Sequence, residues 1–121
     1  MRLSIGGVDI TDYIAHAGLK WQRNDIDSSN AGRTLAGYMV RDRVAIKIRL
    51  DVKCRPLMAD ELKKLLTLIK PQYVEVDYDD PMYGFRRGHS FYSNNVPASF
   101  QMIDAAGNEW WSEVSFPLIE V

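Results

Sequence analysis

The sequence predicts a mainly β, α+β domain: an antiparallel β-sandwich or small barrel that carries a single α-helix. Three patterns lead to this prediction. Between Val44 and Cys54, apolar residues alternate with charged or small ones, the period of two that a strand imposes on its side chains. From Ala59 to Lys70 the period changes to that of an amphipathic helix. Short alternating stretches then recur as far as Val121, separated by turns rich in Gly, Pro, Asn and Asp.

Two short segments around Gly6-Gly7 are expected to pair as a hairpin. Leu3–Ile5 precedes the glycines and Val8–Ile10 follows them. Glycine tolerates the positive φ angles that a tight turn requires, so the pair favours a hairpin turn. The next segment, Thr11–Gly18, is expected to hold one helical turn with Thr11 as its cap.

The polar segment Asn24–Arg33 is expected to be a loop, after a strand at Leu19–Arg23. Its only large apolar residue is Ile26, so it cannot bury enough surface to fix its own conformation. The pattern of Thr34–Cys54 is extended again, and we favour one long strand bent near Arg41–Arg43. A hairpin at that bend is the alternative.

The predicted helix has one apolar stripe that is expected to face the core. Its members follow the spacing i, i+3, i+4, i+7: Leu62, Leu65, Leu66 and Ile69. Pro71 ends the helix, whereas Met58 or Ala59 stands at its start in place of a capping Ser, Thr, Asp or Asn. The start is therefore the weak point of the helix.

The second half of the chain is expected to be a series of strands. Their expected ranges are Val74–Tyr78, Phe85–Tyr92, Ala98–Ile103 and Trp110–Val121. Asp80–Gly84 has the Pro and Gly of a turn, so the strand that follows runs antiparallel to the one before it. Pro117 cannot donate to a sheet ladder, which indicates an edge strand or a bulge.

Length and composition indicate one ordinary globular domain that spans residues 1–121. The chain has 121 residues, of which 46% are hydrophobic and 26% charged. A net charge of −1 argues against a general nucleic-acid binder. Cys54 is the only cysteine and falls on an apolar strand face, so we expect a small buried side chain and no disulfide. With neither a signal peptide nor a long apolar run, a soluble protein made in a cytoplasm is expected.

No catalytic, cofactor or metal site is predicted, and we expect the protein not to be an enzyme. Glu75, Asp77 and Asp79 share one strand face and could hold a hard cation as a metal-dependent hydrolase would. A solvated or ion-paired strand face explains the same row, and its spacing does not match a calcium loop. His16 and His89 lack ligand partners at metal-binding spacing. No nucleophile motif or phosphate-binding glycine loop occurs.

A second alternative is a small β-barrel that binds single-stranded nucleic acid. Arg86 and Arg87 lie among aromatic residues such as Phe85 and Phe91, a weak form of a base-stacking surface. An ordinary half-exposed hairpin explains these residues equally well.

Two strands of opposite charge form the candidate functional surface. Arg41–Arg55 carries a net charge of +4 and Tyr73–Asp80 one of −4. Either the two strands are neighbours that neutralise each other, or the basic face of one copy meets the acidic face of the next copy in a ring. Trp110-Trp111 puts one indole on each strand face, and one of them marks a candidate interface. The candidate interface residues are Arg41, Arg43, Lys47, Arg49, Lys53, Glu75, Asp77, Asp79, Trp110 and Trp111.

Several motifs resemble those of small tail proteins of siphophages and of prophages in Gram-positive bacteria. They are Ile5–Ile14, Gly18–Trp21, Gly32–Thr34 with Gly37, Asp80–Gly84, Phe91–Asn95 with Pro97-Ala98, and Trp111 followed by Ser115–Glu120. The resemblance covers nearly the whole chain, and its motifs are structural. The order of strands around one helix also resembles the tail-tube fold that tube, hub and distal-tail proteins share.

This resemblance implies a virion structural protein located in the tail and assembled in the bacterial host cytoplasm. In the tail-tube fold, subunits form hexameric rings whose sheets join around a channel. The implied partners are other copies of the chain and other tail proteins. No membrane and no specific nucleic acid are implied, beyond passive contact with passing DNA. The part of the tail (tube, distal ring, hub adaptor or neck) stays open. A channel for DNA should not have a basic wall, so the face with Lys47 and Arg49 is expected to be an interface.

Overall fold

The computed structural model describes residues 1–27, 32–33, 39–40 and 43–121, and it is mostly antiparallel β-sheet with one α-helix. The predicted fold class is therefore confirmed. The elements in chain order are β1 (Leu3–Ile5), β2 (Val8–Asp9), η1 (Thr11–Tyr13), β3 (Ile14–Asp27), β4 (Gly32–Arg33), β5 (Met39–Val40), β6 (Arg43–Cys54), β7 (Leu57–Met58), α1 (Ala59–Ile69), β8 (Val74–Asp80), β9 (Gly84–Tyr92), β10 (Ser99–Ile103), β11 (Glu109–Ser112) and β12 (Ser115–Glu120).

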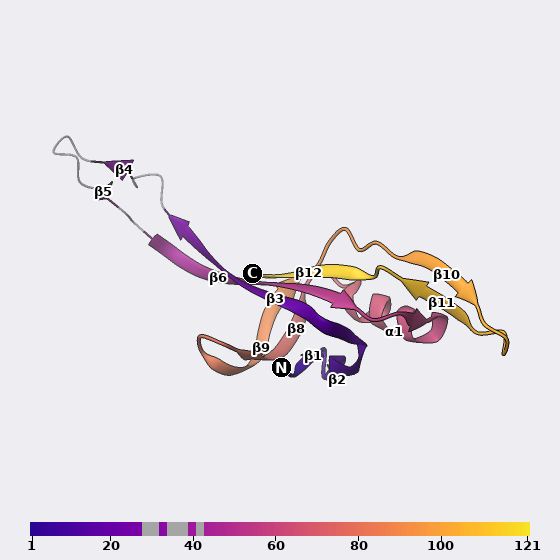
Figure 1. Ribbon diagram of the computed structural model, residues 1–121. Helices are drawn as coiled ribbons and strands as arrows, with labels where there is room; N and C mark the ends of the chain where they lie inside the picture. The colour runs from indigo at the N-terminus through magenta and orange to yellow at the C-terminus, as the bar shows by residue number, and fades with distance from the viewer. Residues whose placement is uncertain (28–31, 34–38, 41–42) are drawn as a thin grey trace.

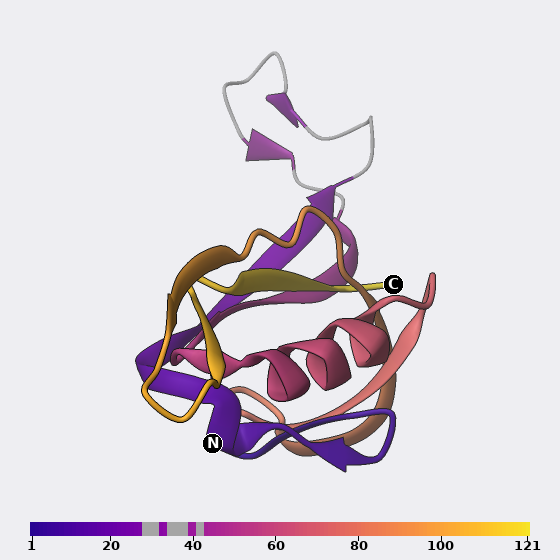
Figure 2. The ribbon, with the colours of Figure 1, turned by 90° about the vertical axis from the view of Figure 1, so that its right-hand side faces the viewer.

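The main sheet has seven strands in the order β2-β1-β8-β9-β12-β6-β3, and every neighbouring pair is antiparallel. Figure 2 shows that this sheet curls around α1, which lies in its concave side. The inward-facing residues of β6 are apolar, as the period of two predicts: Ile48, Leu50 and Val52 are fully buried. These strand residues and the buried residues of α1 form one continuous hydrophobic core, and their burial stabilises the fold.

A second sheet of three strands, in the order β10-β11-β7, lies beside α1 (Figure 1). The predicted continuous strand Trp110–Val121 is wrong, because the chain leaves this sheet after Ser112 and enters the main sheet at Ser115. Glu113 between them has φ +56°, a conformation that interrupts an extended strand. Pro117 lies where β12 pairs with β6 alone, since β12 pairs with β9 only at Ile119 and Glu120. β12 lies between β9 and β6 in the sheet, so the predicted edge strand or bulge is wrong. Pro117 is tolerated because this part of β12 has a neighbour on one side only.

The longest strands, β3 and β6, form a two-stranded ribbon that extends away from the rest of the molecule (Figure 1). The predicted loop Asn24–Arg33 is wrong at its start, because residues 24–27 continue β3 and pair with β6. Cross-strand pairing with Lys47, Ile46 and Ala45 supplies the order that the local composition does not. Residues 28–31 of the predicted loop lie outside the described residues.

Only part of the long strand predicted for Thr34–Cys54 can be judged, because residues 34–38 and 41–42 lie outside the described residues. Arg43–Cys54 forms β6. Met39–Val40 pairs with Gly32–Arg33, and the neighbours of β6 are β3 and β12. Among the described residues, β5 therefore pairs with β4 and not with β6, as the alternative hairpin would require.

The N-terminal hairpin is confirmed, with Gly6 and Gly7 both at positive φ. The single helical turn expected within Thr11–Gly18 is present as a 3-10 turn over Thr11–Tyr13, after which β3 begins at Ile14. Thr11 is not its cap. The Thr11 hydroxyl instead donates to Asp9 Oδ1 at 2.6 Å and accepts the Leu3 amide at 3.0 Å, because it lies inside the turn and faces the hairpin.

Helix α1 is confirmed over Ala59–Ile69, but its apolar stripe is only partly buried. Leu62, Leu65 and Ile69 face the core, whereas Leu66 is 37% exposed. At the start of the helix, Glu61 Oε1 accepts the Met58 amide at 3.2 Å. This acidic residue of the first turn therefore supplies the capping hydrogen bond. Arg55 holds that carboxylate at 2.8 Å, and this hydrogen bond lowers the pKa of Glu61.

Candidate assembly surfaces

The two charged strands lie in different parts of the main sheet. β9 and β12 separate β8 from β6, so the proposed pairing of these strands as neighbours is wrong. In both strands the charged side chains other than that of Asp80 alternate with the buried ones, which places them on the outer, convex side of the curled sheet. One flank of the sheet is therefore basic and the other acidic.

On the basic flank, Lys47 and Arg49 have partners within the chain. Lys47 Nζ donates to the backbone oxygen of Val121 at 2.7 Å, and Arg49 pairs with Asp51 at 3.1 Å. Lys53 is exposed and makes no ion pair with a described residue. Arg43 begins β6. The remaining candidate, Arg41, lies outside the described residues.

On the acidic flank, each carboxylate has a different environment. Asp79 pairs with Arg2 at 3.2 Å, and the hydrogen bond from this guanidinium holds the pKa of Asp79 below its ordinary value. Asp77 accepts the Gly88 amide at the hairpin that joins β9 to β8. Glu75 is exposed and has no ion-pair partner among the described residues. Among the charged candidates whose side chains are described, Glu75 and Lys53 are thus the two with no side-chain hydrogen bond or ion pair.

The two tryptophans lie on β11, in the small sheet rather than on either charged flank. Trp110 Nε1 donates to Asp104 Oδ2 at 2.9 Å, and this hydrogen bond lowers the pKa of Asp104. Trp111 packs against the core and meets the ring of Phe100 edge-on, with 5.7 Å between centroids. Both indoles are half-buried, so neither is wholly available as an interface.

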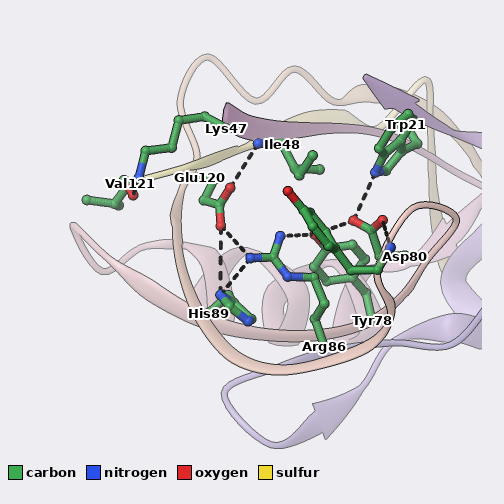
Figure 3. A network of polar contacts seen from close by, with 10 residues as sticks. Trp21, Lys47, Ile48, Tyr78, Asp80, Arg86, His89, Glu120 and Val121 are labelled. Carbon is green, nitrogen blue, oxygen red and sulfur yellow. Dashed lines mark hydrogen bonds and ion pairs between the residues drawn. The ribbon is translucent and has the colours of Figure 1, made fainter. Parts of the chain in front are cut away.

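A polar network on the concave side of the sheet was not predicted from the sequence (Figure 3). It is centred on Asp80, which is only 4% exposed although it follows the acidic face in the sequence. Asp80 Oδ2 accepts the Trp21 indole N–H at 3.0 Å and the Tyr78 hydroxyl at 2.8 Å. Asp80 Oδ1 accepts the backbone amides of Met82 and Tyr83 at 2.6 and 2.9 Å. The period of two along β8 could have predicted this inward position, because Val74, Val76 and Tyr78 share it.

Arg86 extends the network from Asp80 to the far end of the sheet. Its guanidinium donates to the Tyr78 hydroxyl at 2.9 Å, to His89 Nδ1 at 3.0 Å and to Glu120 Oε2 at 3.0 Å. Because a guanidinium only donates, His89 Nδ1 is the acceptor and its Nε2 carries the ring proton. Glu120 Oε1 in turn accepts the Ile48 amide at 2.9 Å. One chain of hydrogen bonds thereby joins β3, β8, β9, β12 and β6.

The pKa values follow from this arrangement. Burial alone would raise the pKa of Asp80, but the four hydrogen bonds that it accepts outweigh that effect and keep the pKa below its ordinary value. Burial and the bond to Asp80 raise the pKa of the Tyr78 hydroxyl, so this group stays protonated and donates. Burial raises the pKa of the Cys54 thiol to about 11. All four donors to Asp80 are held in place by the fold. Asp80 is therefore a structural anchor rather than a group poised for proton transfer.

Within the described ranges, no group of three or more His, Cys, Asp or Glu side chains is arranged to hold a metal ion. In particular, Arg2 occupies Asp79, one of the three carboxylates considered as ligands. The same part of the chain contains no helix that is long and apolar enough to span a membrane.

Comparison of the chain with protein-family models, with curated proteins and with solved structures finds no match. The case for a function therefore depends on the surfaces described above.

Proposed function

We propose that the protein is a structural component of a phage or prophage tail that assembles into rings with itself and with other tail proteins. The fold is consistent with this role, since it is a curled antiparallel sheet with one helix. The motifs that resemble small tail proteins lie mostly in the hairpins and turns of this sheet, at β1–β2, at the β8–β9 turn and along β12.

The observation that carries the proposal is an open sheet edge beside a basic flank, opposite an acidic one. β3 is 14 residues long, and among the described strands of the main sheet its only neighbour is β6. A long exposed edge presents unpaired backbone groups that another chain can pair with. The oppositely charged flanks would fix the polarity of a head-to-tail contact, which is the type of contact that closes into a ring.

Charge reversal at Lys53 and Glu75 tests the proposal. Lys47 and Arg49 are poorer choices than the sequence suggested, because each has a partner within the chain. We expect Lys53→Glu to leave the monomer folded and to weaken ring formation at low salt. Adding Glu75→Lys should restore much of the ring formation, since the charges on both sides of the contact are then reversed. Lys64→Glu, an equal charge change on the exposed side of α1, serves as the control.

Sedimentation velocity and negative-stain images of the four forms give the readout. Exposed charge pairs contribute only about 0.2–1 kcal/mol each, so the charges choose orientation while other contacts supply most of the affinity. A wild-type protein that stays monomeric at high concentration, alone and with other tail proteins, would contradict the proposed assembly. If Lys53→Glu forms rings as well as the wild type does, the proposed assembly would still hold, but the proposed contact between the opposed flanks would be contradicted.

Nucleic-acid binding, the alternative, is favoured by no specific observation. Arg86 is enclosed by Tyr78, His89 and Glu120, and the guanidinium of Arg2 covers the ring of Phe85 at 4.6 Å from its centroid. Two of the residues expected to contact bases are thus engaged within the chain. A gel shift with single-stranded oligonucleotides tests this alternative directly.

A further inference from the structure

A groove of about 410 Å³ lies between α1 and the small sheet, away from both charged flanks. Leu62 and Leu66 line it from the helix, and Trp111 lines it from β11. The apolar surface continues beyond the groove onto β10, where Phe100 meets Trp111 edge-on and is 52% exposed. Several large apolar side chains are therefore contiguous, which is unusual for the surface of a soluble domain without a partner.

The small sheet is only half covered by helix. α1 contacts β7 and β11, whereas every residue of β10 is exposed. A helix about 10 Å wide spans only roughly two strands at a spacing of about 4.8 Å. Phe100 is the pairing partner of Trp111, and Ile103 that of Glu109, so both point to the side of the sheet on which α1 lies. Ile103 is 63% exposed. The space beside α1 and above β10 is thus bounded by two apolar walls and is open to solvent.

The outer strand β10 lacks the usual protection of an edge. Ser99–Ile103 contains no charged residue and no proline, and all five residues are exposed. Soluble proteins commonly place Lys, Glu or Pro on such edges to prevent unwanted contacts. The uncharged strand, with Phe100, Met102 and Ile103 exposed, indicates that this side is covered in the working protein.

The charges at the groove specify what covers it. Lys63 and Lys70 both line the groove on the α1 side, two helical turns apart, and neither pairs with a described acidic residue. Residues spaced this way form one edge of the surface on which a second helix packs beside the first. Leu66 lies between the two lysines on that surface, and Glu109 is the only acidic residue among the described ones that line the groove.

From these contacts we infer that the groove binds an amphipathic helix of a partner protein, which lies beside α1 and over β10. Its apolar face covers Leu66, Trp111 and Phe100, and its acidic flank lies along Lys63 and Lys70. This inference does not depend on the proposed role in a tail, because it uses neither charged flank of the main sheet nor the β3 edge.

Two synthetic helical peptides of 18 residues test it. Both have a leucine face and no tryptophan; one carries Glu and the other Lys at the flank positions seven residues apart. Binding is followed by the protein's tryptophan fluorescence, since Trp111 lines the groove. We expect the Glu peptide to bind about tenfold or more tightly than the Lys peptide. The double variant Lys63→Glu with Lys70→Glu should reverse that order.

Two single variants separate the groove from the rest of the surface. Phe100→Ser should weaken binding of the Glu peptide about tenfold, because it removes an apolar wall. Tyr73→Ser, at a tyrosine that is 56% exposed and outside the groove, should leave binding unchanged. Circular dichroism of each variant verifies that the fold is retained.

Three results would overturn the inference. Equal affinity for both peptides would show that Lys63 and Lys70 do not select an acidic partner. Concentration-dependent self-association of the protein alone that is lost in Leu66→Ser would identify the occupant as a second copy. Binding of anionic phosphatidylserine vesicles without binding of either peptide would identify a lipid surface instead.

Discussion

The indole nitrogen of Trp21 lies 3.0 Å from Asp80 Oδ2, a hydrogen bond between strands that are distant in the sheet. Trp21 belongs to β3 and Asp80 to β8, and β9, β12 and β6 lie between them in the strand order. The two side chains meet because the sheet curls until these strands face each other around α1 (Figure 2). The bond thus ties the open edge strand β3 to the opposite wall of the fold.

Asp80→Asn should destabilise the protein by about 2–4 kcal/mol. An amide nitrogen cannot accept, so the variant leaves two of the four donors to this residue without an acceptor and removes charge-assisted bonds. Urea unfolding followed by fluorescence measures the change. Asp79→Asn is the matched control, because Asp79 lies next to it on the exposed face and pairs only with Arg2. For Asp79→Asn we expect the free energy of unfolding to fall by less than about 1 kcal/mol.

Comparison of the wild type with Asp80→Asn also tests the pH dependence of stability. The folded-state pKa of Asp80 is lowered, so its contribution is present above the unfolded-state pKa near 3.8 and is lost as pH falls through the lower folded value. The free energy of unfolding should therefore fall more steeply below about pH 5 in the wild type than in Asp80→Asn. Parallel acid profiles for the two proteins would show that Asp80 does not anchor the fold as a carboxylate.

Arg86→Lys should cost about 1–3 kcal/mol of stability even though it preserves the charge. A lysine has one nitrogen and cannot reach the Tyr78 hydroxyl, His89 Nδ1 and Glu120 Oε2 together, as the planar guanidinium does. The side chain of Arg86 is 14% exposed, so water cannot replace all these contacts. Arg87→Lys, at the exposed neighbour, should change stability by less than about 0.5 kcal/mol. Equal effects of the two variants in thermal unfolding would contradict the proposed network.

Much of this fold follows from local patterns that the sequence displays openly. The alternation along β6 predicts which side of that strand is buried. The change of period at Ala59 predicts α1 to within one residue of its observed end. Strand order does not follow in this way. The separation of β6 from β8 by two other strands depends on long-range pairing, for which single-strand periodicity holds no information.

The polar network was harder to predict for a related reason. Asp80 lies next to Pro81 and near Gly84, so the turn pattern dominates its interpretation. Its inward position follows from the strand period, but its partner Trp21 lies 59 residues earlier in the sequence. The break at Glu113 is similar, because nothing in the alternation of Trp110–Val121 indicates that the chain changes sheets there.

Two leucines that are adjacent in α1 should respond very differently to truncation. The helical stripe predicts burial of both, whereas Leu65 is fully buried and Leu66 is exposed beside the groove. Leu65→Ala should destabilise the protein by about 2–5 kcal/mol, since it removes buried apolar surface and leaves a cavity. Leu66→Ala should cost less than about 1 kcal/mol in the isolated protein. Comparable losses in denaturant titrations would mean that the groove is filled within the chain.

Cys54 should be almost unreactive toward a thiol reagent in the folded protein. Burial raises its pKa from 9.0 to about 11, so the thiolate fraction at pH 8 falls about a hundredfold. Limited access slows the reaction further, because the residue is 9% exposed. The colour change with Ellman's reagent should therefore be slow in buffer and rapid in 6 M guanidinium chloride. Rapid labelling in buffer would indicate that β6 opens next to Val52 under native conditions.

The amide protons of β3 between Leu19 and Ile26 can show whether this edge is the ring contact. In an antiparallel strand with one neighbour, alternate amides point toward that neighbour and the others toward solvent. Hydrogen exchange in the free protein should therefore alternate along this stretch, with every second amide protected by β6. If rings join at this edge, the remaining amides should become protected on assembly, whereas those on β8, which already has neighbours on both sides, should change little. Residue-resolved exchange on monomer and assembly compares the two states. Protection that is unchanged in β3 while rings form would place the contact elsewhere on the molecule.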